Sequence, residues 1–319
     1  MNMYRKVLGS TLVALFAVAV HAQQPSQITL VVPYPPGGLT DSLARLTGKV
    51  LGENMKVTVI VENKPGANGL IGLQAISQGK PDGSVIGIVP ASVMTVNPSI
   101  YKNMKIDTVK DVTPLTLAVT VPNVLVVNTN VPANNVKELV DWLKKSPGTA
   151  TYATPGLGSS PHLNSELFAK MADVQINHIP YKGAGPAMND LLAGSIQMAF
   201  ANMPTVAPLI QAGKLKALGV TSTAASPHAP NIPPIGATLR GYEDNIWFGF
   251  VGPKDLPGAV TSRLNAELAK ALRSEEVTKA MNESGATITT SSPQEMGRLI
   301  STDLTKWAAL IKERNLKAD

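Results

Sequence analysis

Strand-length apolar runs alternate with amphipathic stretches from residue 28 to residue 252, and this alternation limits the folds open to the chain. In one such stretch Val136, Leu139, Val140 and Leu143 share a helical face. We predict strands at 28–32, 57–61, 85–89, 124–127, 149–152, 176–179, 197–201, 215–221 and 246–252. We predict helices at 41–51, 69–78, 136–145, 161–171, 184–193 and 206–212. This order predicts an α/β fold with largely parallel sheets.

After Pro257 the pattern predicts helices only, at 258–272, 275–282 and 294–314. The last of these helices carries a continuous apolar stripe. The stripe consists of Met296, Leu299, Ile300, Leu304, Trp307, Leu310 and Ile311. We expect it to pack into the core rather than to bind a partner.

The N-terminal segment predicts the cellular location of the protein. A basic segment, Tyr4-Arg5-Lys6, precedes an apolar run at 7–20 that is too short to span a bilayer, and Val20-His21-Ala22 fits a signal-peptidase site. We predict that residues 1–22 are a signal peptide and that the mature chain begins at Gln23 as a soluble periplasmic protein. The absence of cysteine excludes disulfides, thiolate metal sites and a cysteine nucleophile.

Composition argues against nucleic-acid binding. Without Arg5 and Lys6 the chain has 26 basic and 22 acidic residues, its lysines are scattered, and only 4% of its residues are aromatic. The mature chain of about 300 residues is long enough for two lobes, each with its own core.

Two glycine-rich turns each follow a predicted strand and open a predicted helix, at 34–41 (YPPGGLTD) and 154–162 (TPGLGSSPH). The first N–H groups of a helix have no intrahelical partner, and the helix dipole adds partial positive charge there. Neither turn contains Lys or Arg, so main-chain groups would hold an anion. Two such turns facing each other would clamp a small carboxylate or phosphate. The alternative for either turn alone is plain chain reversal.

Signatures of catalysis, nucleotides and metals are weak. Gly156-x-Gly158 lacks the third glycine of a dinucleotide fingerprint, since Pro161 occupies that place, and no phosphate loop is present. Ser77-x-x-Lys80 has the spacing of penicillin-binding enzymes but lacks their partner motifs. His162, His178 and His228 have no metal-ligand spacing, and only His162 lies in a candidate site. We expect no enzyme activity, metal or cofactor.

Together, these segments resemble the extracytoplasmic solute receptors of tripartite tricarboxylate transporters, the Bug family. The similarity runs through nearly the whole mature chain. Its motifs are Val32-Pro33-Tyr34-Pro35-Pro36-Gly37-Gly38-x-x-Asp41-x-x-Ala44-Arg45, Val61-Glu62-Asn63-Lys64-Pro65-Gly66-Ala67-Asn68-Gly69, Pro81-Asp82-Gly83, Gly156-x-Gly158-Ser159-x-x-His162-Leu163, His178-Ile179-Pro180-Tyr181-Lys182-Gly183, Leu191-Leu192-Ala193-Gly194, Ala212-Gly213-Lys214-Leu215-Lys216-Ala217-Leu218 and Trp247-Phe248-Gly249.

The resemblance implies a two-lobed type II periplasmic binding protein fold with a Venus-flytrap cleft. Lobe I would comprise 23–122 and 247–319, lobe II 123–246, with crossings near 121–125 and 245–248. A small carboxylate would be held by main-chain N–H groups and waters, and a monomer would deliver it to membrane components of the transporter. The expected ligand-binding residues are Tyr34, Pro35, Gly37, Gly38, Thr40, Asp41, Ser92, Thr154, Gly156, Gly158, Ser159, His162, Ala201 and Asn202.

The chain departs from the family pattern at Ala201, where the family usually has Asp before Asn202. Without that carboxylate an ammonium group lacks a partner, so we expect a di-, tri- or aromatic carboxylate rather than an acidic amino acid. Tyr34 is expected to form an aromatic wall of the pocket, the alternative being that it packs under the Pro35-Pro36 turn. A ligand sensor for a kinase is the alternative binding role. A secreted hydrolase is disfavoured, because no nucleophile–base pair is visible.

Overall fold

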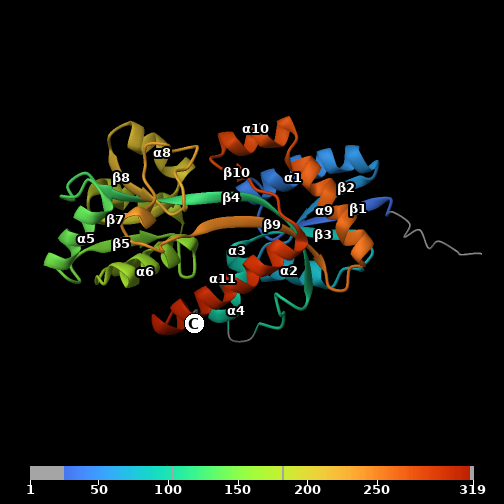
Figure 1. The fold of residues 1–319 in the computed structure, drawn as a ribbon, viewed down its shortest axis with the longest axis horizontal. Coiled ribbons are helices and arrows are strands. Elements are labelled where there is room, and N and C mark those ends of the chain that lie inside the picture. The colour runs from blue at the N-terminus through green and yellow to red at the C-terminus, as the bar shows by residue number, and fades with distance from the viewer. Residues whose placement is uncertain (1–24, 102–103, 182, 317–319) are drawn as a thin grey trace, which may run out of the picture.

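Two lobes lie end to end and are joined by two long strands, β4 (Val112–Asn128) and β9 (Asn245–Pro253) (Figure 1). The structure is a computed structural model and describes residues 25–101, 104–181 and 183–316. The predicted signal peptide lies outside the described residues. Within those ranges, no helix is long and apolar enough to cross a membrane.

One lobe, lobe I, is built on a sheet with the strand order β2-β1-β3-β9-β4. β1 is parallel to β2 and β3, whereas β9 is antiparallel to both of its neighbours. Its other strands are β1 (Gln27–Val32), β2 (Thr58–Asn63), β3 (Val85–Pro90) and β10 (Thr287–Ile288), which pairs with β4. Its helices are α1 (Leu39–Met55), η1 (Ala67–Gly69), α2 (Leu70–Ser77), α3 (Ala91–Thr95), α4 (Asn97–Ile100), α9 (Gly258–Leu272), α10 (Glu275–Glu283) and α11 (Pro293–Glu313).

Lobe II is built around the second half of β4, which lies between β7 and β8. Its other strands are β5 (Thr151–Thr154), β6 (Asn177–Pro180), β7 (Met198–Asn202) and β8 (Leu215–Val220). Its helices are α5 (Val136–Lys145), α6 (Ser160–Ala172), α7 (Ala184–Ala193), α8 (Met203–Gln211) and η2 (Ile235–Ala237). α6, α7 and α8 each start a few residues after a strand, so their N-termini lie at the carboxyl ends of β5, β6 and β7.

Helices cover both faces of the lobe I sheet, which explains why its strands are apolar on both sides. Ile28 and Leu30 lie on one face of β1 and pack with α1 and α9. Val31 lies on the opposite face and packs with α2 and α11. Lobe II has two corresponding core clusters, around Tyr152 on one face and Val124 on the other. The two-lobed α/β fold predicted from the sequence is therefore observed.

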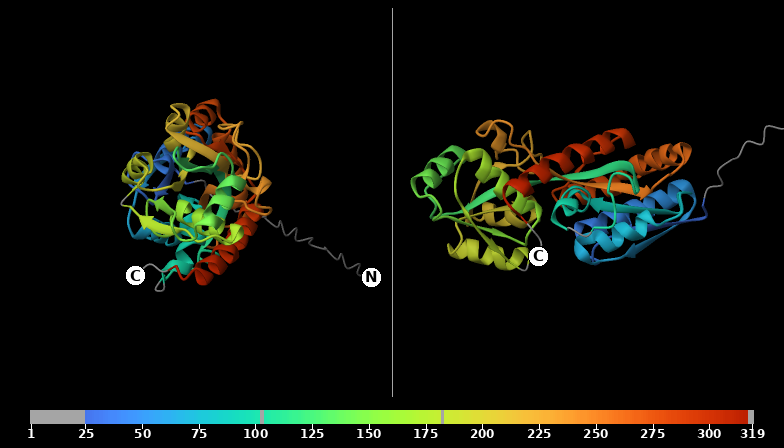
Figure 2. Two further views of the ribbon diagram at one scale, coloured as in Figure 1. Left: turned by 90° about the vertical axis from the view of Figure 1, so that its left-hand side faces the viewer. Right: turned by 90° about the horizontal axis from the view of Figure 1, so that it is seen from below.

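β4 belongs to both lobes. Its residues up to Pro122 pair with β9, and from Asn123 onward it pairs with β7. The change of partner falls inside the predicted crossing at 121–125. β9 returns along the same path from Asn245 (Figures 1 and 2).

Two expectations are wrong. The sheet is mixed rather than largely parallel, because β4 and β9 cross between the lobes antiparallel to each other and to their other neighbours. The region after Pro257 is not helical throughout, since the short β10 at Thr287–Ile288 adds an edge to β4. A two-residue strand carries no periodicity that could announce it.

The predicted stripe on α11 packs inward as expected, with Leu299 and Leu304 partly buried and its other residues buried. Met296 and Ile300 enter the lobe I core, whereas Trp307, Leu310 and Ile311 form a separate cluster. That cluster also contains Val96 and Ile100 of lobe I and Leu163 of lobe II, so α11 packs against both lobes (Figure 2).

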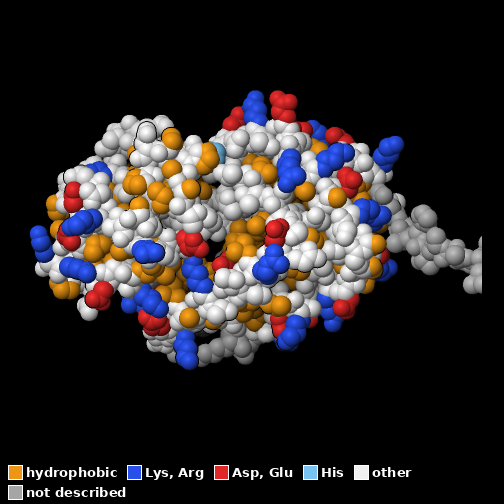
Figure 3. Space-filling model, viewed as in Figure 1, with side chains coloured by type: hydrophobic (Ala, Val, Ile, Leu, Met, Phe, Trp, Pro, Cys, Tyr) orange, Lys and Arg blue, Asp and Glu red, His pale blue; other side chains and the backbone are white. Residues whose placement is uncertain are grey.

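On the face seen in Figure 3, charged side chains of both signs are interspersed.

Candidate ligand-binding site

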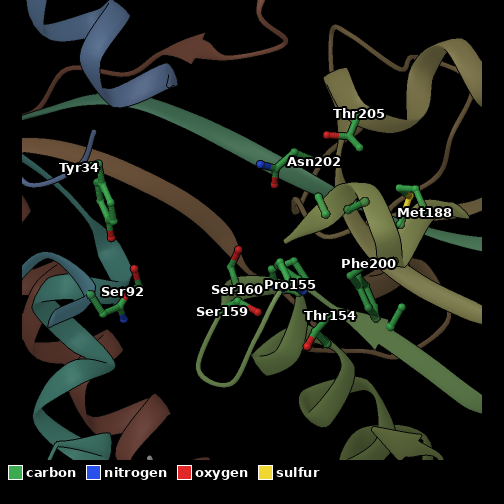
Figure 4. A pocket seen from close by; sticks show the side chains of 16 residues that line it. Tyr34, Ser92, Thr154, Pro155, Ser159, Ser160, Met188, Phe200, Asn202 and Thr205 are labelled. Carbon is green, nitrogen blue, oxygen red and sulfur yellow. The ribbon is translucent and has the colours of Figure 1, made fainter. Parts of the chain in front are cut away.

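A cavity of about 430 Å³ lies between the lobes. Tyr34 and Ser92 of lobe I lie on one side of the gap, and Ser159 and Ser160 lie on the other (Figure 4). The lining residues are Tyr34, Asn68, Ser92, Ala153, Thr154, Pro155, Ser159, Ser160, Pro161, Ala184, Ala187, Met188, Phe200, Ala201, Asn202 and Thr205. None of these described lining residues carries a formal charge.

Three helices of lobe II begin at this cavity. The first turns of α6, α7 and α8 contribute Ser160, Ala184 and Thr205 to its lining. Their N-cap residues are Ser159, Gly183 and Asn202, and none makes a side-chain capping hydrogen bond. The free N–H groups and the helix dipoles therefore favour a negatively charged group in the cavity.

Of the helices that begin elsewhere, α5, α10 and α11 have side-chain caps, whereas α1, α2 and α9 have none. Asn135 accepts a hydrogen bond from Glu138 N at the start of α5, and Ser274 does the same at α10. Ser292 forms a full capping box at α11. The uncapped helix starts at the cavity thus leave donors available for a ligand.

Lobe II also contributes an apolar part of the wall. Phe200 is 2% exposed and Met188 is 8% exposed, and Ala153, Ala187 and Ala201 lie beside them. Such a wall accommodates the carbon skeleton of a ligand.

Lobe I contributes neutral polar groups. Burial raises the pKa of Tyr34, and the hydrogen bond with Ser92 lowers it less, so the phenol stays protonated and can donate. Asn68 is held in place by Asn97, since each side-chain amide donates to the other residue. Asn68 has φ +49° in a run of positive φ from Gly66 to Gly69.

Of the first glycine turn, only Tyr34 lines the cavity. Asp41 accepts a hydrogen bond from Gly37 N, at 3.0 Å, so this main-chain donor is bound within the turn. The Asp41 carboxylate also pairs with Arg45 and accepts from Asn63 Nδ2. Although burial opposes ionisation, these partners lower the pKa of Asp41 to about 2. The predicted residues Pro35, Gly37, Gly38, Thr40 and Asp41 are absent from the lining, whereas Tyr34 at the start of the turn is part of it.

The second glycine turn reaches the cavity with Thr154 and Ser159. Gly156, Gly158 and His162 lie behind this surface. Gly158 N donates to His162 Nδ1 at 3.1 Å, and the His162 side chain is 1% exposed. Burial first, and His178 second, lower the pKa of His162 to about 4, so its ring is neutral at physiological pH.

Of the predicted residues, the cavity brings together Tyr34, Ser92, Thr154, Ser159, Ala201 and Asn202. Sequence reasoning missed Asn68. The PGANG segment at 65–69 could have indicated an unusual turn there, because glycine and asparagine are the residues that best tolerate positive φ. It also missed the starts of α7 and α8, which carry no glycine-rich turn of the kind used to find α6. The other unpredicted lining residues are Ala153, Pro155, Ser160, Pro161, Ala184, Ala187, Met188, Phe200 and Thr205.

Comparison with known proteins gives the family. A sequence profile described as "Tripartite tricarboxylate transporter family receptor" matches residues 43–316. The chain belongs to this receptor family. BugT of Bordetella pertussis is 33% identical over 294 residues, which cover 91% of this chain and 90% of that protein.

Solved structures agree with this assignment. The periplasmic binding protein BugD is 31% identical with a TM-score of 0.73, covering 92% of this chain and 99% of its own. Rpa4515 of R. palustris, solved with adipate, is 32% identical with a TM-score of 0.76, covering 92% of this chain and 98% of its own. The predicted resemblance to Bug proteins and the periplasmic binding protein fold are confirmed.

Proposed function

We propose that this receptor binds an organic carboxylate in the cavity between its lobes. The observation that supports this most is the convergence of three uncapped helix N-termini on a cavity whose described lining has no charged side chain. Such a site attracts an anion through main-chain donors and dipoles rather than through an ion pair. The hydroxyls of Tyr34 and Ser92 would bind a polar group on the lobe I side.

The ligand class follows from what surrounds the cavity. No carboxylate of the described lining residues could pair with an ammonium group, and Ala201 stands where the family resemblance led us to expect Asp. A di- or aromatic carboxylate is therefore favoured over an acidic amino acid. The relative Rpa4515, which was solved with adipate, shows that a member of this family accommodates a linear dicarboxylate.

Binding would be coupled to closure of the lobes. Lobe I comprises 23–122 and 247–319 and lobe II 123–246 in this proposal, with the hinge in β4 and β9. A ligand that contacts both lobes stabilises the closed state by its extra contacts there. The closed receptor, secreted after removal of residues 1–22, would deliver its ligand as a monomer to the transporter's membrane components. Presentation to a sensor kinase is the alternative for the same closed form.

Catalysis is the competing function, and one contact favours it: Thr154 Oγ1 lies 2.6 Å from His178 Nε2. The described residues give His178 no carboxylate hydrogen-bond partner, and burial lowers its pKa. We therefore favour binding without turnover. Turnover of carboxylic esters or amides by purified protein, lost in His178→Gln, would reverse this choice.

A thermal-shift screen tests the proposed function. The set contains mono-, di- and tricarboxylates, aromatic acids, glutamate and aspartate. A ligand at 100 times its dissociation constant adds about 2.7 kcal/mol to the free energy of unfolding, which is readily seen. We expect at least one di- or aromatic carboxylate to stabilise the protein, before and after EDTA treatment. Stabilisation by none of them, or by acidic amino acids alone, would contradict the proposal.

A further inference from the structure

Three aromatic rings form a column behind the second glycine turn; those of Tyr152 and His162 are buried and that of His178 is half-buried. The rings of Tyr152, His178 and His162 are stacked, with centroids 5.0 Å apart for Tyr152–His178 and 4.1 Å apart for His178–His162. They come from β5, β6 and α6, three separate elements of lobe II. None of the three lines the cavity.

Two rings of the column are hydrogen-bonded to the turn, one near its start and one near its end. His162 Nδ1 accepts the N–H of Gly158, just before the α6 N-cap. His178 Nε2 is hydrogen-bonded to Thr154 Oγ1, which lines the cavity. The rings thereby fix the turn that presents the start of α6 to the ligand.

The far side of the column is tied to the C-terminal helix. Glu166 of α6 is 6% exposed and accepts hydrogen bonds from the Tyr152 hydroxyl and from Arg314 Nε. Its Oε1 also lies 4.0 Å from His162 Nε2. Arg314 is the C-cap residue of α11, a helix that packs against α3 and β4.

We propose that Arg314 is a positioning residue for the ligand-binding turn at 154–159, acting through Glu166 and the ring column. The inference rests on the proposed carboxylate site and adds a residue that does not touch the ligand. Arg314 supplies the only formal positive charge that the described hydrogen bonds give to Glu166. Loss of this partner leaves a buried carboxylate without its counter-charge, so Glu166 must move or be solvated. Tyr152, and with it the stacked rings and the turn, then loses its fixed position.

The hydrogen bond between Gly158 and His162 also depends on pH. His162 can accept the Gly158 N–H only while Nδ1 is unprotonated. The groups that face it are Glu166 on its own helix, Tyr152 of β5, His178 of β6 and, beyond Glu166, Arg314 of α11. Its pKa of about 4 keeps this hydrogen bond intact at neutral pH. Below about pH 4 the turn loses this anchor.

The test compares Arg314→Met with a matched control. Glu313→Gln breaks the neighbouring ion pair between Lys170 and Glu313, which joins the same two helices but is exposed and outside the column. The first readout needs no ligand: the amide proton shift of Gly158 and the ¹⁵N shifts of the His162 ring report the hydrogen bond directly. The second is the dissociation constant for adipate, measured by calorimetry at pH 7.

In Arg314→Met we expect the Gly158 and His162 signals to shift towards the unbonded state and adipate affinity to fall about tenfold. Glu313→Gln should leave both unchanged, and Arg314→Lys should restore part of each. Tyr152→Phe, which keeps the ring but removes the hydroxyl, provides a second variant if Arg314→Met does not fold. Unchanged Gly158 and His162 signals in the variants of Arg314 or Tyr152, or an equal loss of affinity in the control, would overturn the inference. Failure of the wild type to bind adipate or any other acid of the screen would count against the proposed function, while the NMR readout would still decide the role of Arg314.

Discussion

At the residue scale, Gly38 and Gly158 are the second glycines of the two glycine turns but occupy different places, because Gly38 is the N-cap of α1 whereas Gly158 precedes Ser159, the N-cap of α6. Gly158 has φ +71°, and a Cβ there would lie 2.5 Å from Ile100 Cδ1 of lobe I. Gly38 has φ −86° and nothing within 4 Å of a built Cβ. Sequence reasoning treats the two glycines alike, because a sequence motif does not reveal backbone angles or contacts between the lobes.

We therefore predict that Gly158→Ala lowers the free energy of unfolding by about 2–3 kcal/mol through left-handed strain and overpacking. Gly38→Ala should cost less than about 1 kcal/mol. Urea unfolding of both variants beside wild type checks this. Equal losses for the two would mean that the contact of Gly158 with lobe I is not as described.

We predict that Ala201 influences which ligands bind. It lies on β7 and lines the cavity. Ala201→Asp should weaken binding of dicarboxylates and raise the affinity for glutamate relative to them by about tenfold, because the new carboxylate pairs with an ammonium group. Ala201→Asn has similar volume without charge and is the control. Calorimetry that finds the same selectivity in both variants, or tight glutamate binding by wild type, would remove Ala201 from this role.

At the scale of elements, the starts of α6, α7 and α8 are the parts of the site that we propose to bind the anion. Asn202 is the N-cap of α8 and lines the cavity, whereas Asn135 is the N-cap of α5 and is not among the residues that line it. Asp caps a helix as well as Asn does. The two Asn→Asp substitutions add the same charge at a helix start, although Asn135 also donates its amide to Glu138 Oε1 and Asn202 makes no capping hydrogen bond.

Asn202→Asp should keep its melting temperature but lose carboxylate affinity by tenfold or more, because the added charge repels the ligand and occupies helix N–H groups. Asn135→Asp should keep its carboxylate affinity and lose some stability, because the new carboxylate faces Glu138, to which the Asn135 amide donates. Thermal unfolding and calorimetry separate the two effects. Normal binding by Asn202→Asp would show that α8 does not face the anion.

The helices α5, α7 and α9 begin and end at the residues expected from the sequence. Their apolar periodicity and their terminal signals suffice to define them. The short α3 and α4 were not predicted, because helices of 5 and 4 residues carry no period. The antiparallel crossing of β4 and β9 depends on pairing between segments more than a hundred residues apart, which local pattern does not encode.

The candidate site was foreseeable in part for similar reasons. Thr154 and Ser159 follow from the strand–turn–helix pattern, and Tyr34 from its place before the first glycine turn. Asp41 was expected to face the ligand, yet in the structure its carboxylate binds Gly37 N, Arg45 and Asn63. Whether an acidic residue faces a ligand or its own backbone is decided by packing that a sequence pattern does not contain.

At the scale of the whole molecule, the two crossings meet at a buried polar group. Asn164 of α6 accepts a hydrogen bond from Asn123 on β4 and donates to Asp244, which precedes β9. Burial raises the pKa of Asp244 to about 7, although Lys306 nearby opposes this. A carboxyl group whose pKa is raised on folding stabilises the fold below its unfolded pKa and loses that contribution as pH rises through the folded value.

The contribution of Asp244 should therefore fall between about pH 4 and pH 7. Asp244→Asn keeps the acceptor for Asn164 and removes the titration. We predict equal stability of variant and wild type just below pH 4 and a variant that is more stable by about 4 kcal/mol at pH 8. Urea unfolding at both pH values tests it, with Asp141→Asn in an exposed ion pair as control. A variant that is less stable than wild type at pH 8 would show that the ionised Asp244 is favourably paired at the hinge.

The central claim is that an uncharged cavity between two lobes binds a carboxylate through helix N-termini. Calorimetric titration of a set of linear and aromatic dicarboxylates, each beside its neutral diamide, tests this most directly. We predict a dissociation constant in the micromolar range, about −8 kcal/mol, for at least one carboxylate, and binding at least about 100-fold weaker for its diamide. Equal affinity for acid and amide, or no binding of any carboxylate, would contradict the account.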